Sequence, residues 1–404
     1  MMEPQRDKLI KQHVIDPEIC IRCGTCEATC SIGAVSHDDN NYVVDPEKCN
    51  SCLDCIAPCP TGSIDNWRLV RSAYTLDEQL GWLELPVQAD VGGDAVTPGG
   101  VADEANDHAV GALIDQAHAG GGGRPVAPAS AARPVVNLYG RNAPAVATVQ
   151  GNYRITAATA SSDVRHIVLG FGDTAFPVLE GQTIGIAPPV TDPDGRPYPL
   201  RLYSVASARD GEKRNANNLA LTVKRVPGGL VSEWLCNLAV GTRIAVTGPF
   251  GATFLMPDDP AAHILMICTG TGSAPFRGFT ERRRRMLPPA SGRLVMVFGA
   301  RTPQELPYFG PLQKVPPRLL EQHLVYSRVP GVPKTYVQDR IREQADAMAP
   351  LLQADGTHIF ICGLKGMETG VDDAMTDVAL RVGLDWATLK PQLRAQGRYH
   401  VETY

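Results

Sequence analysis

The chain has 404 residues, 44% of them hydrophobic, and a formal net charge of -5. This length predicts two or three domains, and the composition suits a globular protein without an apolar run of the roughly 20 residues that cross a bilayer. The weak charge gives no reason to expect nucleic acid or a membrane as a partner. Because residues 1–18 hold no apolar signal core, we expect a cytoplasmic protein whose 11 cysteines are ligands or free thiols.

Eight cysteines form two sets, and each member of the first set recurs 29 residues later. The sets are Cys20, Cys23, Cys26 and Cys30, followed by Cys49, Cys52, Cys55 and Cys59. The repeat includes flanking residues, since 16–18 and 45–47 are both Asp-Pro-Glu, as in a duplicated half-domain. This spacing binds 4Fe–4S clusters, and the fourth cysteine of each run ligates the other cluster.

The spacing therefore predicts two crossed ligand sets. Cluster 1 takes Cys20, Cys23, Cys26 and Cys59, and cluster 2 takes Cys49, Cys52, Cys55 and Cys30. Zinc is the alternative, although its ligands usually come as two spaced pairs.

Residues 14–64 resemble two-cluster bacterial ferredoxins, with Ser31 where that family usually has proline. This stretch holds eight acidic residues against two basic ones, a net of -6, which is either an ordinary solvated surface or a docking face for a basic partner or for the second half of the chain.

Residues 66–85 contain Trp67, Tyr74 and Trp82 and predict a short extension that completes a ferredoxin module over 1–85. Residues 86–134 are rich in Gly, Ala, Pro and Asp and lack aromatic residues, which predicts a flexible linker with one weak helix over 101–118. About 50 flexible residues have a reach on the order of 40 Å, so this linker would let the module swing between flavin and partner.

Residues 135–257 read as short alternating strands separated by Gly and Pro, which predicts an antiparallel β-barrel. The expected strands are 147–149, 166–169, 183–186, 202–205, 219–226 and 243–246. At the fourth, Arg201 directly before the strand suits the pyrophosphate of FAD, Tyr203 the isoalloxazine face and Ser204 its N5 atom. A plain half-buried strand is the alternative.

A second flavin contact is expected at Gly229, Leu230, Val231 and Ser232, where backbone amides at a helix start would bind the pyrophosphate. The alternative is an ordinary helix with Ser232 as its N-cap.

Residues 258–404 change to apolar runs that end in small or polar residues, the pattern of a parallel α/β sheet. Ligands bind at the carboxyl ends of such strands, where the Gly-rich turn 269–277 includes Thr271. A hydroxyl, cations and an aromatic ring at neighbouring strand ends predict the site of a 2'-phosphate, and therefore NADPH rather than NADH; a plain charged loop is the alternative. The residues are Arg301, Ser327, Arg328, Lys334, Tyr336 and Gln338.

From about residue 200 to residue 404 the chain resembles plant-type ferredoxin–NADP reductases, through residues 253–257, 270–277, 361–368 and 400–404. The resemblance implies that Ser204, Cys362 and Glu402 surround the nicotinamide and flavin N5, that Tyr404 stacks on the isoalloxazine, and that Gly363 lines the nucleotide site. The chain departs from the family at residues 230–232, which lack a common cysteine, and at Thr403, where valine is usual.

These parts predict an enzyme that oxidises NADPH and passes electrons through FAD and two 4Fe–4S clusters to a separate oxygenase. The same parts would also serve electron flow towards NADPH or another acceptor, and a redox-sensing binding protein is a further alternative. No Glu-x-x-His pairs for a di-iron site occur in the sequence, so any oxygen chemistry belongs to another polypeptide. The fusion is similar to the reductase component of benzoyl-CoA 2,3-epoxidase, which implies aromatic catabolism; the oligomeric state, a homodimer included, stays open.

Overall fold

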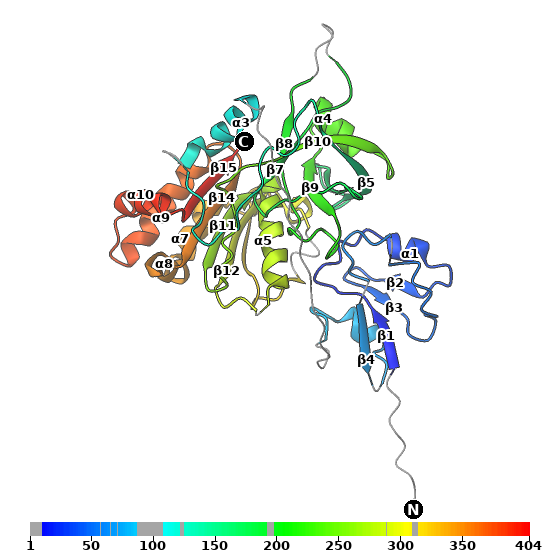
Figure 1. The fold of residues 1–404 in the computed structure, drawn as a ribbon. Helices are drawn as coiled ribbons and strands as arrows, with labels where there is room; N and C mark the ends of the chain where they lie inside the picture. Colours follow the sequence, from blue (N-terminus) through cyan, green and yellow to red (C-terminus); the bar gives the residue numbers. More distant parts are fainter. Residues whose placement is uncertain are drawn as a thin grey trace, which may run out of the picture. The chain divides into compact units, whose positions relative to one another are not determined.

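The computed structural model describes residues 10–56, 58–64, 66–70, 72–86, 108–121, 125–191, 198–287, 289–308 and 314–404 (Figure 1). The chain divides into two compact units. Unit 1 comprises residues 1–100 and 308–316, and unit 2 comprises 101–307 and 317–404. No helix in the described ranges is long and apolar enough to span a membrane.

Unit 1 is built from two small antiparallel pairs, β1 (Ile10–Val14) with β4 (Asn66–Val70) and β2 (Val35–His37) with β3 (Tyr42–Val44). Its helices are α1 (Thr25–Thr29) and α2 (Leu76–Leu80). The sequence repeat is also a structural repeat: the carboxylates of Asp16 and Asp45 each accept from the amide two residues on, at 2.9 and 3.0 Å. These matching turns lead into the two cysteine sets.

The predicted aromatic extension of unit 1 packs beside the cysteine-bearing part. Trp67 of β4 stacks on His13 of β1, with ring centroids 4.2 Å apart, and Tyr74 meets Trp82 edge to face. Asn41 Nδ2 donates to the backbone oxygens of Leu80 and Trp82 at 2.9 and 2.8 Å, which anchors the end of α2. The aromatic residues of this extension therefore have packing roles.

The first part of unit 2 is a six-stranded antiparallel sheet in the order β8-β7-β10-β5-β6-β9. An isolated bridge from Val205 to Leu221 joins its end strands, which closes the sheet into the predicted barrel. Helix α4 (Leu230–Cys236) follows β9. The strands are β5 (Ala145–Arg154), β6 (Val164–Gly170), β7 (Thr183–Ile186), β8 (Arg201–Ser204), β9 (Asn218–Lys224) and β10 (Arg243–Phe250).

The second part of unit 2 is a five-stranded sheet in the order β13-β12-β11-β14-β15, with every pairing parallel. The fold class predicted from the sequence is thereby confirmed. The strands are β11 (His263–Thr269), β12 (Leu294–Ala300), β13 (Glu321–Tyr326), β14 (Thr357–Gly363) and β15 (Tyr399–Thr403). The helices are α5 (Ala274–Arg285), α7 (Val337–Glu343), α8 (Ala345–Gln353), α9 (Met367–Arg381) and α10 (Trp386–Ala395), with short 3₁₀ turns η2 (Gly270–Ser273) and η3 (Pro303–Glu305).

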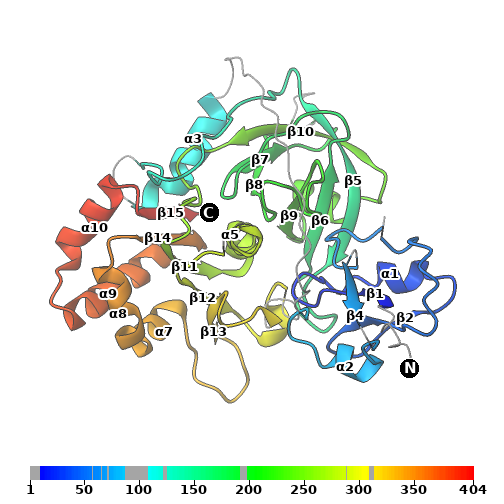
Figure 2. The same cartoon turned by 60° about the horizontal axis from the view of Figure 1, so that its bottom comes forward.

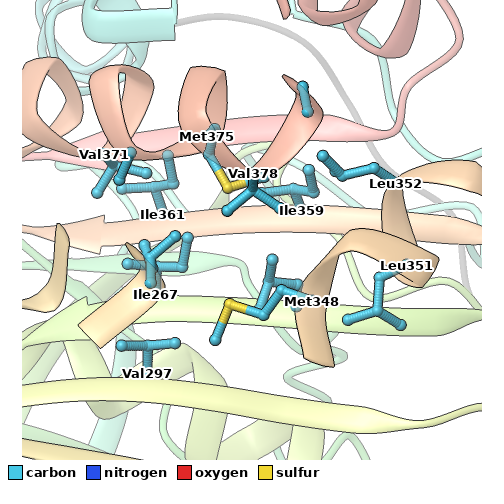
Figure 3. Close-up of a cluster of buried hydrophobic side chains, with 14 of the residues drawn as sticks. Ile267, Val297, Met348, Leu351, Leu352, Ile359, Ile361, Val371, Met375 and Val378 are labelled. Atoms are coloured by element: carbon cyan, nitrogen blue, oxygen red, sulfur yellow. The ribbon is translucent and has the colours of Figure 1, made fainter. Parts of the chain in front are cut away.

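Alternate residues along these strands pack on opposite faces of the sheet, as the period of two requires. Ile267, Ile359 and Ile361 meet the apolar sides of α7, α8 and α9 (Figure 3). On the opposite face, Phe360 packs edge to face against Phe279 of α5, with centroids 5.0 Å apart. Figure 2 looks along α5, which lies between the sheet and the barrel strands. Residues of β14 and β15 on the α5 face, Cys362 among them, are therefore directed towards the barrel.

Part of the predicted linker packs on unit 2. Helix α3 (His108–His118) lies within the expected 101–118 range and continues into η1 (Ala119–Gly121). Val110 is buried against Leu200 and Phe250, and the backbone of Ser130 accepts from Asp258 at 3.3 Å. The chain is thus not free over 108–121 and 125–134, while 87–107 and 122–124 lie outside the described residues. The domain boundaries themselves stay predictions.

Candidate functional site

Three of the predicted catalytic residues meet where the barrel joins the parallel sheet. Ser204, the last residue of β8, donates from Oγ to Oε1 of Glu402 on β15 at 3.0 Å. Cys362 of β14 stands opposite Glu402 in the parallel register and is fully buried. The three side chains come from parts of the chain far apart in sequence, so the fold creates this group.

The environment of Glu402 is unusual for a carboxyl group. The residue is 7% exposed, and burial raises its pKa to about 7, although the Ser204 hydroxyl lowers it in part. Burial also raises the pKa of the Cys362 thiol well above its usual range. Near neutral pH the thiol is therefore protonated, while Glu402 sits close to its titration point, where it can hold or release a proton.

Tyr404 lies beside this group and is half exposed. Its hydroxyl is 3.0 Å from that of Thr271 in the Gly-rich turn, and its amide donates to Gly363 at 3.0 Å. The turn approaches β14 closely because Gly272 has no side chain: a Cβ there would lie 2.2 Å from the Cys362 oxygen. The structure thus brings Thr271 and Gly363, predicted for the nucleotide, together with Tyr404, predicted for the isoalloxazine, at the carboxyl end of β14.

The predicted flavin residues lie along β8 and at the start of α4. Arg201 is exposed, and among the residues that the structure describes it has no ion-pair partner, which suits a pyrophosphate. Tyr203 is half-buried against the barrel core. Arg201 and Tyr203 would hold FAD, which would supply two-electron chemistry when bound.

Helix α4 begins at Leu230 with Gly229 as its N-cap, so Ser232 is not the cap residue that the alternative reading assumed. Leu230 is exposed and Val231 is buried. The Ser232 hydroxyl donates to the Gly229 oxygen and accepts from the Val226 amide, each at 3.2 Å. In this structure it therefore stabilises the turn that presents the helix start.

A buried ion network at the junction of barrel and sheet escaped the sequence analysis. Arg277 of α5 donates to both oxygens of Glu212 at 2.6 and 2.7 Å, and also to the backbone oxygen of Ala206. His166 of β6 lies 3.2 Å from the same carboxylate. Although burial acts against ionisation, Arg277 and His166 hold the pKa of Glu212 far below its usual range. This network fixes the loop after Ser204 to the nucleotide domain.

The predicted 2'-phosphate residues gather at the carboxyl ends of β12 and β13. The amides of Ser327 and Arg328 donate to the oxygens of Ala300 and Arg301 at 3.1 and 2.7 Å, which holds the two strand ends together. Arg328 and Lys334 have no carboxylate partner among the described residues, whereas Arg301 makes a long contact of 3.9 Å with Glu305. Two cations without carboxylate partners suit an added phosphate.

The remaining two predicted nucleotide residues lie where α7 begins. Tyr336 is its N-cap residue and is 47% exposed. Gln338, in the first turn of α7, lies against Gly370 of α9. The exposed ring of Tyr336 is available to a ligand.

The eight predicted cluster ligands fall into two groups in unit 1. Burial raises the pKa of Cys20 to about 12 and also raises that of Cys26, and repulsion from the Cys59 thiolate adds to both. Burial raises the pKa of Cys55 to about 11, with added repulsion from Cys49 and then Cys30. Each group thus includes the distant cysteine that the crossed prediction assigns to it.

All eight thiols are free of disulfides, so each is available as a metal ligand. No group of three or more His, Cys, Asp or Glu side chains in the described ranges is placed to hold a single metal ion. Each of the two groups offers four cysteine sulfurs, which is the donor set that a 4Fe–4S cluster takes. The residues present therefore fit such clusters, which would carry electrons singly.

Comparison with known proteins agrees with this division. Residues 11–63 match the 4Fe-4S dicluster domain family, 155–254 the oxidoreductase FAD-binding domain family and 266–373 the oxidoreductase NAD-binding domain family. The ferredoxin–NADP reductase of Thermosynechococcus vestitus is 37% identical over 289 residues, which cover 67% of this chain and 75% of that protein. The chain belongs to the ferredoxin–NADP reductase family. It is an NADP-dependent flavin oxidoreductase with a 4Fe–4S ferredoxin domain.

Other ferredoxin–NADP reductases give the same picture. The protein from Spirulina is 36% identical over 67% of this chain and 98% of its own length, and leaf isozyme 2 of Oryza sativa subsp. japonica is 35% identical over 67% and 78%. The structure of ferredoxin-NADP+ reductase from Plasmodium falciparum superposes with a TM-score of 0.54 at 24% identity, covering 67% of this chain and all of that one. This structural likeness shows the shared fold.

Proposed function

We propose that the protein oxidises NADPH and passes the electrons through FAD and two 4Fe–4S clusters to a separate oxygenase, in a system like that of benzoyl-CoA 2,3-epoxidase. The observation that carries the proposal is the presence, in one chain, of a flavin reductase unit and of two groups of four cysteines. FAD supplies two-electron chemistry and the clusters one-electron chemistry, so together they convert a hydride donor into a source of single electrons.

Different residues of unit 2 bind and orient NADPH and FAD. Arg328 and Lys334 bind the 2'-phosphate of NADPH, and Arg201 binds the flavin pyrophosphate. Ser204 and Glu402 form the polar pair beside flavin N5, and Glu402 can hold a proton at neutral pH because its pKa is raised to about 7. Cys362 stays protonated and excludes water from the same place.

Tyr404 is suited to be a movable cover of the flavin ring. The residue is 54% exposed, and its side chain is tied to Thr271 through a single hydroxyl contact. One such hydrogen bond contributes only about 0.5–1.5 kcal/mol, so binding of the nicotinamide can displace the ring. The tyrosine then acts as both a lid and a gate.

Two other functions use the same parts. The enzyme would run towards NADPH if reduced ferredoxin were the donor, and the clusters would be sensors if no acceptor took their electrons. Anaerobic addition of NADPH to the full-length protein, followed by low-temperature electron paramagnetic resonance, separates these cases. The proposal expects a signal from reduced clusters, and Arg328→Ala should slow its appearance. A reduced flavin beside clusters that stay oxidised would favour one of the alternatives.

A further inference from the structure

Hydroxyl side chains surround the cysteines of cluster 1. Thr25 Oγ1 lies 3.2 Å from Cys23 Sγ. Ser63 Oγ lies 3.4 Å from Cys59 Sγ, and Thr61 Oγ1 lies 3.8 Å from the same sulfur. Thr61 and Ser63 are each only 4% exposed, so packing holds their hydroxyls in place. A thiolate bound to iron can only accept, so each hydroxyl would be the donor.

Ser63 also acts on a second cysteine of the same set, because burial raises the pKa of the Cys20 thiol and the Ser63 hydroxyl lowers it in part. It therefore lies between the first cysteine of cluster 1 and the distant cysteine that completes it. This position makes Ser63 the central member of the three.

The repeat shows that cluster 2 lacks these hydroxyls. Twenty-nine residues away from Thr25, Thr61 and Ser63 stand Asp54, Ile32 and Ala34. Within the described part of the chain, no side-chain hydroxyl is within hydrogen-bonding distance of a cluster 2 cysteine.

The polar contacts of cluster 2 are of another kind. The Ala34 amide donates to Cys30 Sγ at 3.2 Å, and His13 Nδ1 lies 3.9 Å from Cys49 Sγ. The two halves thus share their cysteine spacing but differ in the side chains that contact the sulfurs.

We propose that Thr25, Thr61 and Ser63 raise the reduction potential of cluster 1, which makes the two clusters inequivalent. The inference rests on the proposed function in taking each cysteine group to bind a cluster. Reduction adds one electron, with no proton transferred and no bond made or broken. Hydroxyl donors stabilise the added negative charge on the thiolates, and they do so strongly in a buried site.

A difference in charge adds to the contrast between the two clusters. Asp54 is exposed and places a carboxylate in the turn of cluster 2, where Thr25 supplies a hydroxyl to cluster 1. A nearby negative charge disfavours the entry of an electron. With unequal potentials, the first electron to enter the module rests on cluster 1.

A redox titration of the full-length protein, followed by electron paramagnetic resonance, tests this inference. Ser63→Ala should lower one of the two potentials by about 59 mV, a tenfold change for one electron, and leave the other unchanged. Ser63→Thr keeps a hydroxyl and should keep the native potential. The reciprocal change Ala34→Ser should raise only the other potential. The signal that Cys59→Ala removes identifies cluster 1.

The iron content of the protein shows whether the two-cluster assignment or the hydroxyl set has failed. Four irons per chain would contradict the two-cluster assignment itself. Eight irons with both potentials unmoved by Ser63→Ala, or with both moved equally, would overturn the hydroxyl set alone. If Ser63→Ala lowers the iron content, Thr25→Val gives the same test at Cys23, and an unchanged potential there would also overturn it.

Discussion

The Ser204 hydroxyl donates a 3.0 Å hydrogen bond to Oε1 of Glu402, which joins strand β8 of the barrel to strand β15 of the parallel sheet. The bond crosses the boundary between the predicted flavin and nucleotide domains. Because the Glu402 carboxyl group is buried, its pKa is raised to about 7. The junction of barrel and parallel sheet and the ionisation of one side chain are thus linked at a single place.

Glu402→Gln should change how stability depends on pH. The folded-state pKa is raised from 4.5 to about 7, so the stability that protonated Glu402 provides is complete below pH 4.5 and is lost as the pH rises through 7. Over that range the native protein should lose about 3 kcal/mol more than the glutamine variant. Thermal unfolding at pH 5 and at pH 7.5 measures the difference; equal pH dependence in the two proteins would show that the pKa of Glu402 is not raised.

Arg328→Ala should lower kcat/KM for NADPH selectively. Loss of one charge-assisted bond to the 2'-phosphate should cost about 1.5–3 kcal/mol in kcat/KM for NADPH and leave NADH nearly untouched. Steady-state reduction of ferricyanide measures both. Arg342→Ala is the matched control, because that guanidinium already pairs with Asp377 at 2.6 Å. Equal losses with both nucleotides would place the phosphate elsewhere.

Cys59→Ala should damage the cluster that also takes Cys20, Cys23 and Cys26, although Cys59 lies far from them in the sequence. The native protein should contain eight irons per chain after anaerobic assembly. Cys236→Ala is the control, since that buried cysteine of α4 should bind no iron. Stoichiometric zinc in the native protein, or loss of only the other cluster in Cys59→Ala, would contradict the crossed assignment.

Tyr404→Ala should increase the affinity for NADP+, because no ring then has to be displaced from the flavin. Tyr404→Phe loses only the contact with Thr271, so its affinity should change by less than about tenfold. Titration of the flavin absorbance with NADP+ measures both dissociation constants. Unchanged or weaker binding in Tyr404→Ala would mean that the ring does not cover the nicotinamide position.

Most of the fold could be predicted from local sequence patterns. The 29-residue cysteine repeat and the continuous apolar runs of β11 and β14 can both be recognised from residues close together in the sequence. The contacts that could not be predicted from the sequence join residues that lie far apart in the chain and belong to no recognisable motif. Arg277 and Glu212 are 65 residues apart, and their pairing depends on how α5 packs on the barrel.

The linker prediction had a different weakness. Low aromatic content suggested free chain, yet Val110 of α3 is buried against Leu200 and Phe250. The apolar surface that covers this helix is supplied by the barrel and cannot be seen in the composition of the segment itself. A shortened protein that keeps the flavin unit intact should therefore begin near residue 101, and not at 135.

The most direct test of the proposed electron route compares the full-length protein with one that contains only residues 101–404. Both should bind FAD and reduce ferricyanide with NADPH at similar rates, because that reaction needs only unit 2. With the purified oxygenase component as acceptor, we predict turnover for the full-length protein and almost none for the shortened one. Equal turnover of the oxygenase by both proteins would contradict the account, since the electrons would then leave from the flavin directly.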